Sequence, residues 1–183
     1  MVARLEPLLT IADLDSIPED GNRYELIEGE LFVSRADALA HQRIVGKALF
    51  LFAKYLRENP IGEIIPGAGA ILSDFSAVIP DLLYLSFERA KEIATGDRLT
   101  GAPELIIEVL SPGTENRRRD EHAKRQLYKK YGVKEYWILD PQQRTVRVFR
   151  TARFKLTATL GVRDMLATPL LPGFRCPVKE IFN

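Results

Sequence analysis

The stretch from Ile79 to Pro141 reads IPDLLYLS at 79–86, APELIIEVLSPGTENRRRDEHAKRQLYKKYG at 102–132 and VKEYWILDP at 133–141. Apolar runs of strand length predict buried strands at about 78–86, 104–110 and 133–139. The segment between the last two has helical periodicity and is followed by Gly132, a residue that suits the left-handed conformation after a helix. This order of elements predicts an α/β fold around a mixed central sheet.

Two of these predicted strands carry a carboxylate among apolar residues. Asp81 opens the first strand, and Glu108 lies inside the second. A buried carboxylate without a partner is strongly unfavourable, and a cation would stabilise both acids. Mg²⁺ prefers oxygen ligands, usually one or two carboxylates with water and substrate phosphate. The two acids therefore predict a divalent-cation site, although a Pro80-Asp81 pair at the start of a strand is also typical of a simple turn.

The predicted helix at about 117–131 adds polar side chains to this pair. Asp120, Lys124 and Tyr128 recur at intervals of four residues and share one face of the helix. Lys124 could hold a phosphate, or orient and activate a water molecule for attack on a phosphodiester bond. The structural alternative is a surface ion pair between Asp120 and Lys124, which would contribute little to stability.

Length and composition limit the alternatives. The 183 residues fit a single domain, with boundaries 1–183, that is long enough to bury a substantial core. A net charge of +1 means that any surface for a polyanion must be local. Cys176 is the only cysteine, which excludes an intrachain disulfide and a cysteine-rich zinc site. Because the sequence has neither a signal peptide nor an apolar stretch of membrane-spanning length, we expect a cytoplasmic protein that makes no membrane contact.

Outside the stretch that decides the fold, the sequence predicts further strands and one long helix. The apolar residues between about 38 and 58 recur at helical spacing and end at Asn59-Pro60, which predicts that helix. Thr10 and Asp13 predict a short helix that begins with a capping box. The remaining expected strands, of which the last two form a β-rich C-terminal edge, are 23–27, 31–33, 62–71 with a bend, 144–150 and 154–160.

These motifs resemble those of a known group of nucleases. Pro80-Asp81 followed by Glu108-Val109-Leu110 is similar to the signature of the PD-(D/E)XK nuclease superfamily. A longer set of motifs resembles the restriction-endonuclease-like family that is abundant in cyanobacteria and other bacteria: YELIEGE at 24–30, His41, EVLSP at 108–112, Asp120 with Lys124 and Tyr128, and GVKEYWILDP at 132–141. The resemblance covers nearly the whole chain. It implies a restriction-endonuclease-like core, with helices flanking a mixed central β-sheet.

The resemblance also implies roles for individual residues. The superfamily carries a lysine two residues after the second acid, where this sequence has Leu110. We expect Lys124 to take its place from the following helix and to position or activate the attacking water. Asp81, Glu108 and the backbone carbonyl of Val109 are the expected ligands of Mg²⁺, for which Mn²⁺ could substitute.

Four further residues are expected to support this site: Glu25, His41, Asp120 and Tyr128. Glu25 would reach a second cation or one of its water ligands, and its alternative is an exposed strand acid. His41 would contact phosphate or form a hydrogen bond within the site, and its alternative is a structural cap on the long helix. The resemblance further implies a homodimer, for which the hairpin at Asp140 is a candidate contact. Tyr136 and Trp137 are expected in the core.

We therefore expect a Mg²⁺-dependent endonuclease that acts on DNA. The departure at Leu110 and the near-zero net charge keep a second hypothesis open, a nucleic-acid-binding or assembly module that retains the fold without cleaving. A third hypothesis is a glycosidase that uses the two acids as acid and base. It is disfavoured because the single tryptophan lies in an apolar strand and not in a sugar cleft.

Overall fold

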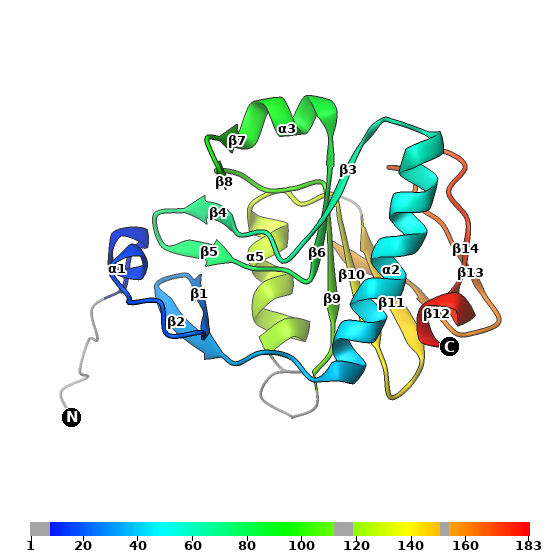
Figure 1. Cartoon of the computed structure of the whole chain (residues 1–183), viewed down its shortest axis with the longest axis horizontal. Coiled ribbons are helices and arrows are strands. Elements are labelled where there is room, and N and C mark those ends of the chain that lie inside the picture. Colours follow the sequence, from blue (N-terminus) through cyan, green and yellow to red (C-terminus); the bar gives the residue numbers. More distant parts are fainter. Residues whose placement is uncertain (1–7, 112–118, 151–153) are drawn as a thin grey trace.

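The computed structural model of the protein describes residues 8–111, 119–150 and 154–183, and only the backbone of residues 119–121. Its centre is a six-stranded mixed sheet (Figure 1). The strand order is β12 (Lys155–Leu160), β11 (Thr145–Arg150), β10 (Glu135–Asp140), β9 (Leu105–Val109), β6 (Leu82–Ser86) and β3 (Gly62–Pro66). β9 and β10 run parallel, and the other neighbouring pairs run antiparallel. The predicted mixed central sheet with a β-rich C-terminal edge is confirmed.

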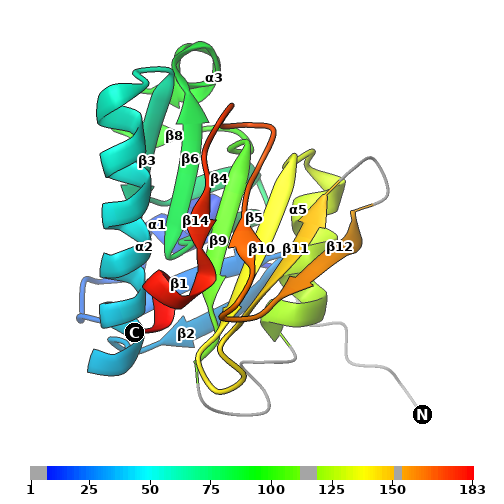
Figure 2. The same cartoon turned by 90° about the vertical axis from the view of Figure 1, so that its right-hand side faces the viewer.

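The alternation of side chains along β9 gives this sheet two buried faces. Ile107 points to the face covered by α2 (Leu39–Glu58) and α6 (Val178–Phe182). Ile106 points to the opposite face, where α5 (Arg125–Lys130) packs. Figure 2 shows α6 beside α2, and α5 across the sheet from them. β9 is therefore buried on both sides, as its continuous apolar sequence predicts.

A second sheet, which was not predicted, adds to the α5 face of the core. Its six strands follow the order β2 (Glu30–Ser34), β1 (Arg23–Ile27), β5 (Ser76–Val78), β4 (Ala70–Ser73), β8 (Arg98–Leu99) and β7 (Ala94–Thr95). β4 and β8 run parallel, and the other neighbouring pairs run antiparallel. Ile27, Ala70 and Val78 from this sheet share a core cluster with Leu127 and Tyr128 of α5.

Between β3 and β6 the chain leaves the central sheet for the second sheet and returns, which corrects two predicted strands. The bent strand expected at 62–71 is two strands of different sheets, β3 and β4, because the chain turns at Gly67 with φ +61°. The strand expected at 78–86 is likewise β5 and β6, interrupted where Pro80 cannot donate a ladder hydrogen bond. The Gly67 N–H donates to the Asp81 carbonyl at 3.1 Å, so the two crossings lie side by side at Asp81.

Two predicted helices are confirmed, and the third is divided. α1 (Ile11–Asp15) begins with the predicted capping box between Thr10 and Asp13, and α2 covers the expected residues. A further helix, α3 (Phe87–Ile93), follows β6. The segment predicted as one helix at 117–131 is a π-helix, η1 (Arg119–Lys124), followed by α5, while residues 117 and 118 lie outside the described residues. Gly132 follows with φ +82°, the left-handed conformation expected there.

The C-terminal residues complete the α2 face of the core. β13 (Met165–Leu166) and β14 (Cys176–Pro177) form a small antiparallel sheet, and Cys176 is a buried free thiol. Trp137 is fully buried, as expected. The Asp140 carboxylate accepts the N–H groups of Gln142 and Gln143 at 2.9 and 3.0 Å, so it closes the hairpin between β10 and β11. Within the described ranges, no helix combines the length and apolar character needed to cross a membrane.

Replacing Phe52 with alanine should lower the free energy of unfolding by about 3–5 kcal/mol. Phe52 holds α2 on the sheet, since its ring centroid lies 5.6 Å from that of Trp137 and 4.8 Å from that of Phe174. Urea denaturation followed by tryptophan fluorescence measures the change. Phe50→Ala is the matched control, because Phe50 lies on the exposed face of the same helix and its loss should cost less than about 0.5 kcal/mol. Equal losses in the free energy of unfolding for Phe52→Ala and Phe50→Ala would contradict the packing of α2 on the sheet.

Candidate functional site

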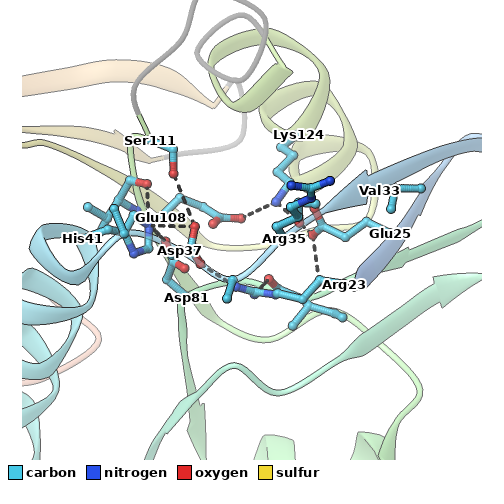
Figure 3. A pocket seen from close by; sticks show the side chains of 15 residues that line it. Arg23, Glu25, Val33, Arg35, Asp37, His41, Asp81, Glu108, Ser111 and Lys124 are labelled. Atoms are coloured by element: carbon cyan, nitrogen blue, oxygen red, sulfur yellow. Dashed lines mark hydrogen bonds and ion pairs between the residues drawn. The ribbon is translucent and has the colours of Figure 1, made fainter. Parts of the chain in front are cut away.

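A polar cavity of about 360 Å³ lies where the two sheets meet the beginning of α2 and the end of β9 (Figure 3). Its walls come from β1 and β2, the β2–α2 connection, the crossing before β6, the end of β9 and η1. It is lined by Arg23, Glu25, Val33, Ser34, Arg35, Ala36, Asp37, Ala38, His41, Ile79, Asp81, Glu108, Val109, Ser111 and Lys124.

Glu108 reaches this cavity from the middle of the central sheet. Because side chains alternate along β9, Glu108 shares a face with Ile106 and Leu110, and this is the face that α5 covers. Its Oε1 accepts hydrogen bonds from the Lys124 ammonium at 2.9 Å and from the Tyr128 hydroxyl at 3.0 Å. The helix thus brings a cation and a hydrogen-bond donor to an acid that would otherwise be very unfavourable inside the sheet.

Lys124 is itself buried, with 3% of its surface exposed. Its Nζ lies 2.9 Å from Glu108 Oε1 and 2.9 Å from Glu25 Oε1. Leu110, at the superfamily's lysine position, packs in the apolar core. The ammonium therefore reaches the second acid from the following helix, which is the position that the sequence predicts for it.

Glu25 connects the second sheet to the cavity. It is 5% exposed, so the alternative of an exposed strand acid is wrong. Its Oε1 also accepts the Ile79 N–H at 2.8 Å and so fixes the chain two residues before Asp81. Tyr128 is fully buried, and burial together with the negative charge of Glu108 raises the pKa of its hydroxyl well above the usual value. The hydroxyl therefore stays protonated and can donate to Glu108.

Asp81 lies immediately before β6, at the crossing between the sheets. Its Oδ2 accepts the Val109 N–H at 2.8 Å and lies 3.2 Å from His41 Nε2. Because β6 pairs directly with β9, the residue next to Glu108 binds the Asp81 carboxylate. The two acids therefore reach the same cavity from neighbouring strands, although 27 positions separate them in the sequence.

His41 points into the cavity from the first turn of α2 (Figure 3). Its Nε2 lies 3.0 Å from the Val109 carbonyl and 3.2 Å from Asp81 Oδ2, and these acceptors place a proton on Nε2. Burial opposes the charged form of His41, but its hydrogen bond to Asp81 and the negative charges of Asp81 and Asp37 outweigh burial and raise its pKa. His41 thus contacts the site, and it does not cap the helix.

Asp37 was not predicted from the sequence. Its Oδ1 lies 3.9 Å from His41 Nε2, and its Oδ2 forms an ion pair with Arg23 Nη1 at 2.9 Å. Arg23 also donates to the Ile79 carbonyl at 2.7 Å, so it ties Asp37 to the crossing before Asp81. The four-residue spacing between Asp37 and His41 could have indicated that the two side chains are neighbours. However, Asp37 precedes α2, so the helical periodicity of the sequence does not include it.

The ligand atoms of Asp37, His41 and Asp81 all lie within 4.8 Å of one another, which makes them a candidate metal site. The set predicted from the sequence shares Asp81 but adds Glu108 and the Val109 carbonyl. In this structure Glu108 binds Lys124 and Tyr128, while the Val109 carbonyl contacts His41. The predicted set therefore stays a prediction.

Seven of the predicted site residues surround one region of the structure: Glu25, His41, Asp81, Glu108, Val109, Lys124 and Tyr128. The backbone of Asp120 lies in η1, but the structure does not describe its side chain. Its predicted role therefore stays untested.

A mixed α/β fold with this polar cavity at the end of a central strand is of the restriction-endonuclease-like class. The chain belongs to the Uma2 family, described as "Putative restriction endonuclease", whose model matches residues 11–179. This membership confirms the resemblance seen in the sequence.

The fold is also similar to a crystal structure from Anabaena variabilis ATCC 29413, titled as a putative nuclease belonging to DUF820. The TM-score is 0.78 at 19% sequence identity, and the match covers 95% of this chain and 97% of that one. At this identity the likeness establishes the fold. A search of curated proteins found no match.

In metal-free protein, His41 should make stability depend on pH. Because folding raises its pKa, its contribution to the free energy of unfolding is fully present below the unfolded-state pKa of about 6.5. The contribution is lost as the pH rises through the folded-state pKa. Urea denaturation in EDTA should therefore show the difference in stability between the wild type and His41→Gln shrinking above about pH 6.5. A difference that grows with pH would contradict the assigned contacts.

Proposed function

We propose that the protein is a divalent-cation-dependent endonuclease that hydrolyses phosphodiester bonds of DNA. The observation that carries this proposal is the meeting of Asp81, Glu108 and Lys124 around one polar cavity. Membership of a family described as putative restriction endonucleases supports it. From the family resemblance we also propose a homodimer, and we propose that it acts in the cytoplasm.

The side chains around the cavity fit a divalent cation. Asp81 and Asp37 offer carboxylate oxygens and His41 an imidazole nitrogen, all close together in a largely buried region. Mg²⁺ favours such oxygen donors, and Mn²⁺ accepts oxygen and imidazole ligands. As the family resemblance implies, we propose Asp81, Glu108 and the Val109 carbonyl as the ligands, with Asp37 and His41 bordering the same position. When bound, the cation would neutralise phosphate charge and lower the pKa of a water molecule.

The surrounding side chains have separate roles in this proposal. Lys124 orients the attacking water or the scissile phosphate with its ammonium. Glu25 and Tyr128 are positioning residues, because Glu25 contacts the ammonium and Tyr128 donates to Glu108. His41 holds Asp81 in place from α2. Asp120 stays a candidate supporting residue on the strength of the motif alone.

The rim of the cavity offers a contact for the substrate. Arg35 is exposed in the β2–α2 connection and lines the cavity (Figure 3). Several carboxylates line the cavity, and they repel an anionic phosphodiester unless cations offset them. A guanidinium at the mouth would attract the nucleic-acid backbone, and we assign Arg35 this role.

The second candidate function is a nucleic-acid-binding module that does not cleave. The contacts of Lys124 with two carboxylates favour it, because an ammonium held in this way is less available to a substrate. DNA binding that needs no metal, weakens steeply with salt and leads to no cleavage would identify such a module.

Plasmid cleavage in Mg²⁺ or Mn²⁺ tests the leading proposal. Asp81→Asn and Glu108→Gln should each slow cleavage by about 100-fold or more, since even outer-shell partners of a metal are worth about 10–100-fold. EDTA should abolish it. Glu28→Gln is the control, because Glu28 is an exposed acid that pairs with Lys130 and does not line the cavity. Undiminished cleavage by the double variant Asp81→Asn/Glu108→Gln would refute the site.

Arg35→Ala should weaken DNA binding and reduce the slope of log K against log salt by about one, the effect of losing one phosphate contact. Fluorescence anisotropy in the cleavage-deficient Asp81→Asn/Glu108→Gln background measures this slope. The matched control is Arg57→Ala, which removes an exposed arginine at the other end of α2 and should leave the slope unchanged. Equal effects of the two variants would contradict a specific role for Arg35.

A further inference from the structure

The contacts of Lys124 resemble those of a bound cation. Its Nζ lies 2.9 Å from an oxygen of Glu25, in β1, and 2.9 Å from an oxygen of Glu108, in β9. All three residues are at most 5% exposed. Two acids from different sheets thus share one ammonium in a region with little access to water.

These two carboxylates are held by bonds that do not involve Lys124. Glu25 Oε1 accepts the Ile79 N–H at 2.8 Å, and Glu108 Oε1 accepts the Tyr128 hydroxyl at 3.0 Å. Ile79 lies in the connection between β5 and β6, and Tyr128 lies in α5, so neither donor belongs to η1. The paired oxygens should therefore keep their positions when the ammonium is removed.

Two negative charges this close and this buried require a cation between them. Lys124 supplies a single positive charge from a tethered side chain, whereas carboxylate pairs of this kind are also ligands for hard divalent cations. A tethered ammonium has the advantage of high effective concentration, so it excludes a free ion from the same position.

We propose that Glu25 and Glu108 form a second cation position, which Lys124 fills with its own ammonium. While the ammonium of Lys124 occupies this position, no divalent ion can bind there. The protein therefore binds one divalent ion fewer than it would without Lys124. The proposal builds on the neighbouring cation site proposed above, but it requires neither that site to be occupied nor DNA to be cleaved.

Titration calorimetry with Mn²⁺ alone tests the number of ions that each variant binds. Lys124→Ala should bind one more Mn²⁺ per chain than the wild type, and Lys124→Ala/Glu25→Gln should lose that additional ion. Lys130→Ala is the matched control, since Lys130 lies in the adjoining helix and pairs with the exposed Glu28 at 2.6 Å. It should bind the same number of ions as the wild type.

A second variant decides the question even where Lys124→Ala does not fold. Glu25→Gln retains the lysine and should bind the same number of Mn²⁺ ions per chain as the wild type, because Glu25 there contacts an ammonium and no metal. Loss of an ion in Glu25→Gln, or an unchanged stoichiometry in folded Lys124→Ala, would overturn the proposal. A wild type that binds no Mn²⁺ would refute the proposed function, whereas one Mn²⁺ in Lys124→Ala would still support this inference.

Discussion

The ion pairs of Lys124 with Glu25 and Glu108 are the interaction on which the rest of the site depends. They join β1 of the second sheet, β9 of the central sheet and the helical segment that follows β9. Without the ammonium, two carboxylates would be buried at a large cost in free energy, because the region offers little water. The same contacts that stabilise this junction also fix the walls of the cavity.

The passages of the chain from β3 to β4 and from β5 to β6 explain why the cavity forms at this place. Gly67 allows the turn after β3, and Pro80 ends the ladder before β6, so neither strand continues into the neighbouring sheet. Asp81 lies at the second passage and binds the backbone of β9. The break in regular structure before β6 thus places the Asp81 carboxylate beside Glu108, the buried acid of β9.

Much of this arrangement could be predicted from local patterns. The apolar run around Glu108 indicates a buried strand, and the four-residue spacing of Lys124 and Tyr128 indicates that both reach it from one helix face. The second sheet could not be predicted, since its short strands carry weak alternation and are defined by pairings far apart in sequence. Asp37 could not be predicted as a site residue for a related reason. Its position beside His41 and Asp81 depends on tertiary contacts.

Anomalous diffraction from crystals soaked in Mn²⁺ tests the central claim most directly. The account predicts one ion per chain beside the Asp81 carboxylate, with the Lys124 ammonium still between Glu25 and Glu108. Crystals that show no ion at Asp81, or an ammonium turned away from both glutamates, would contradict it.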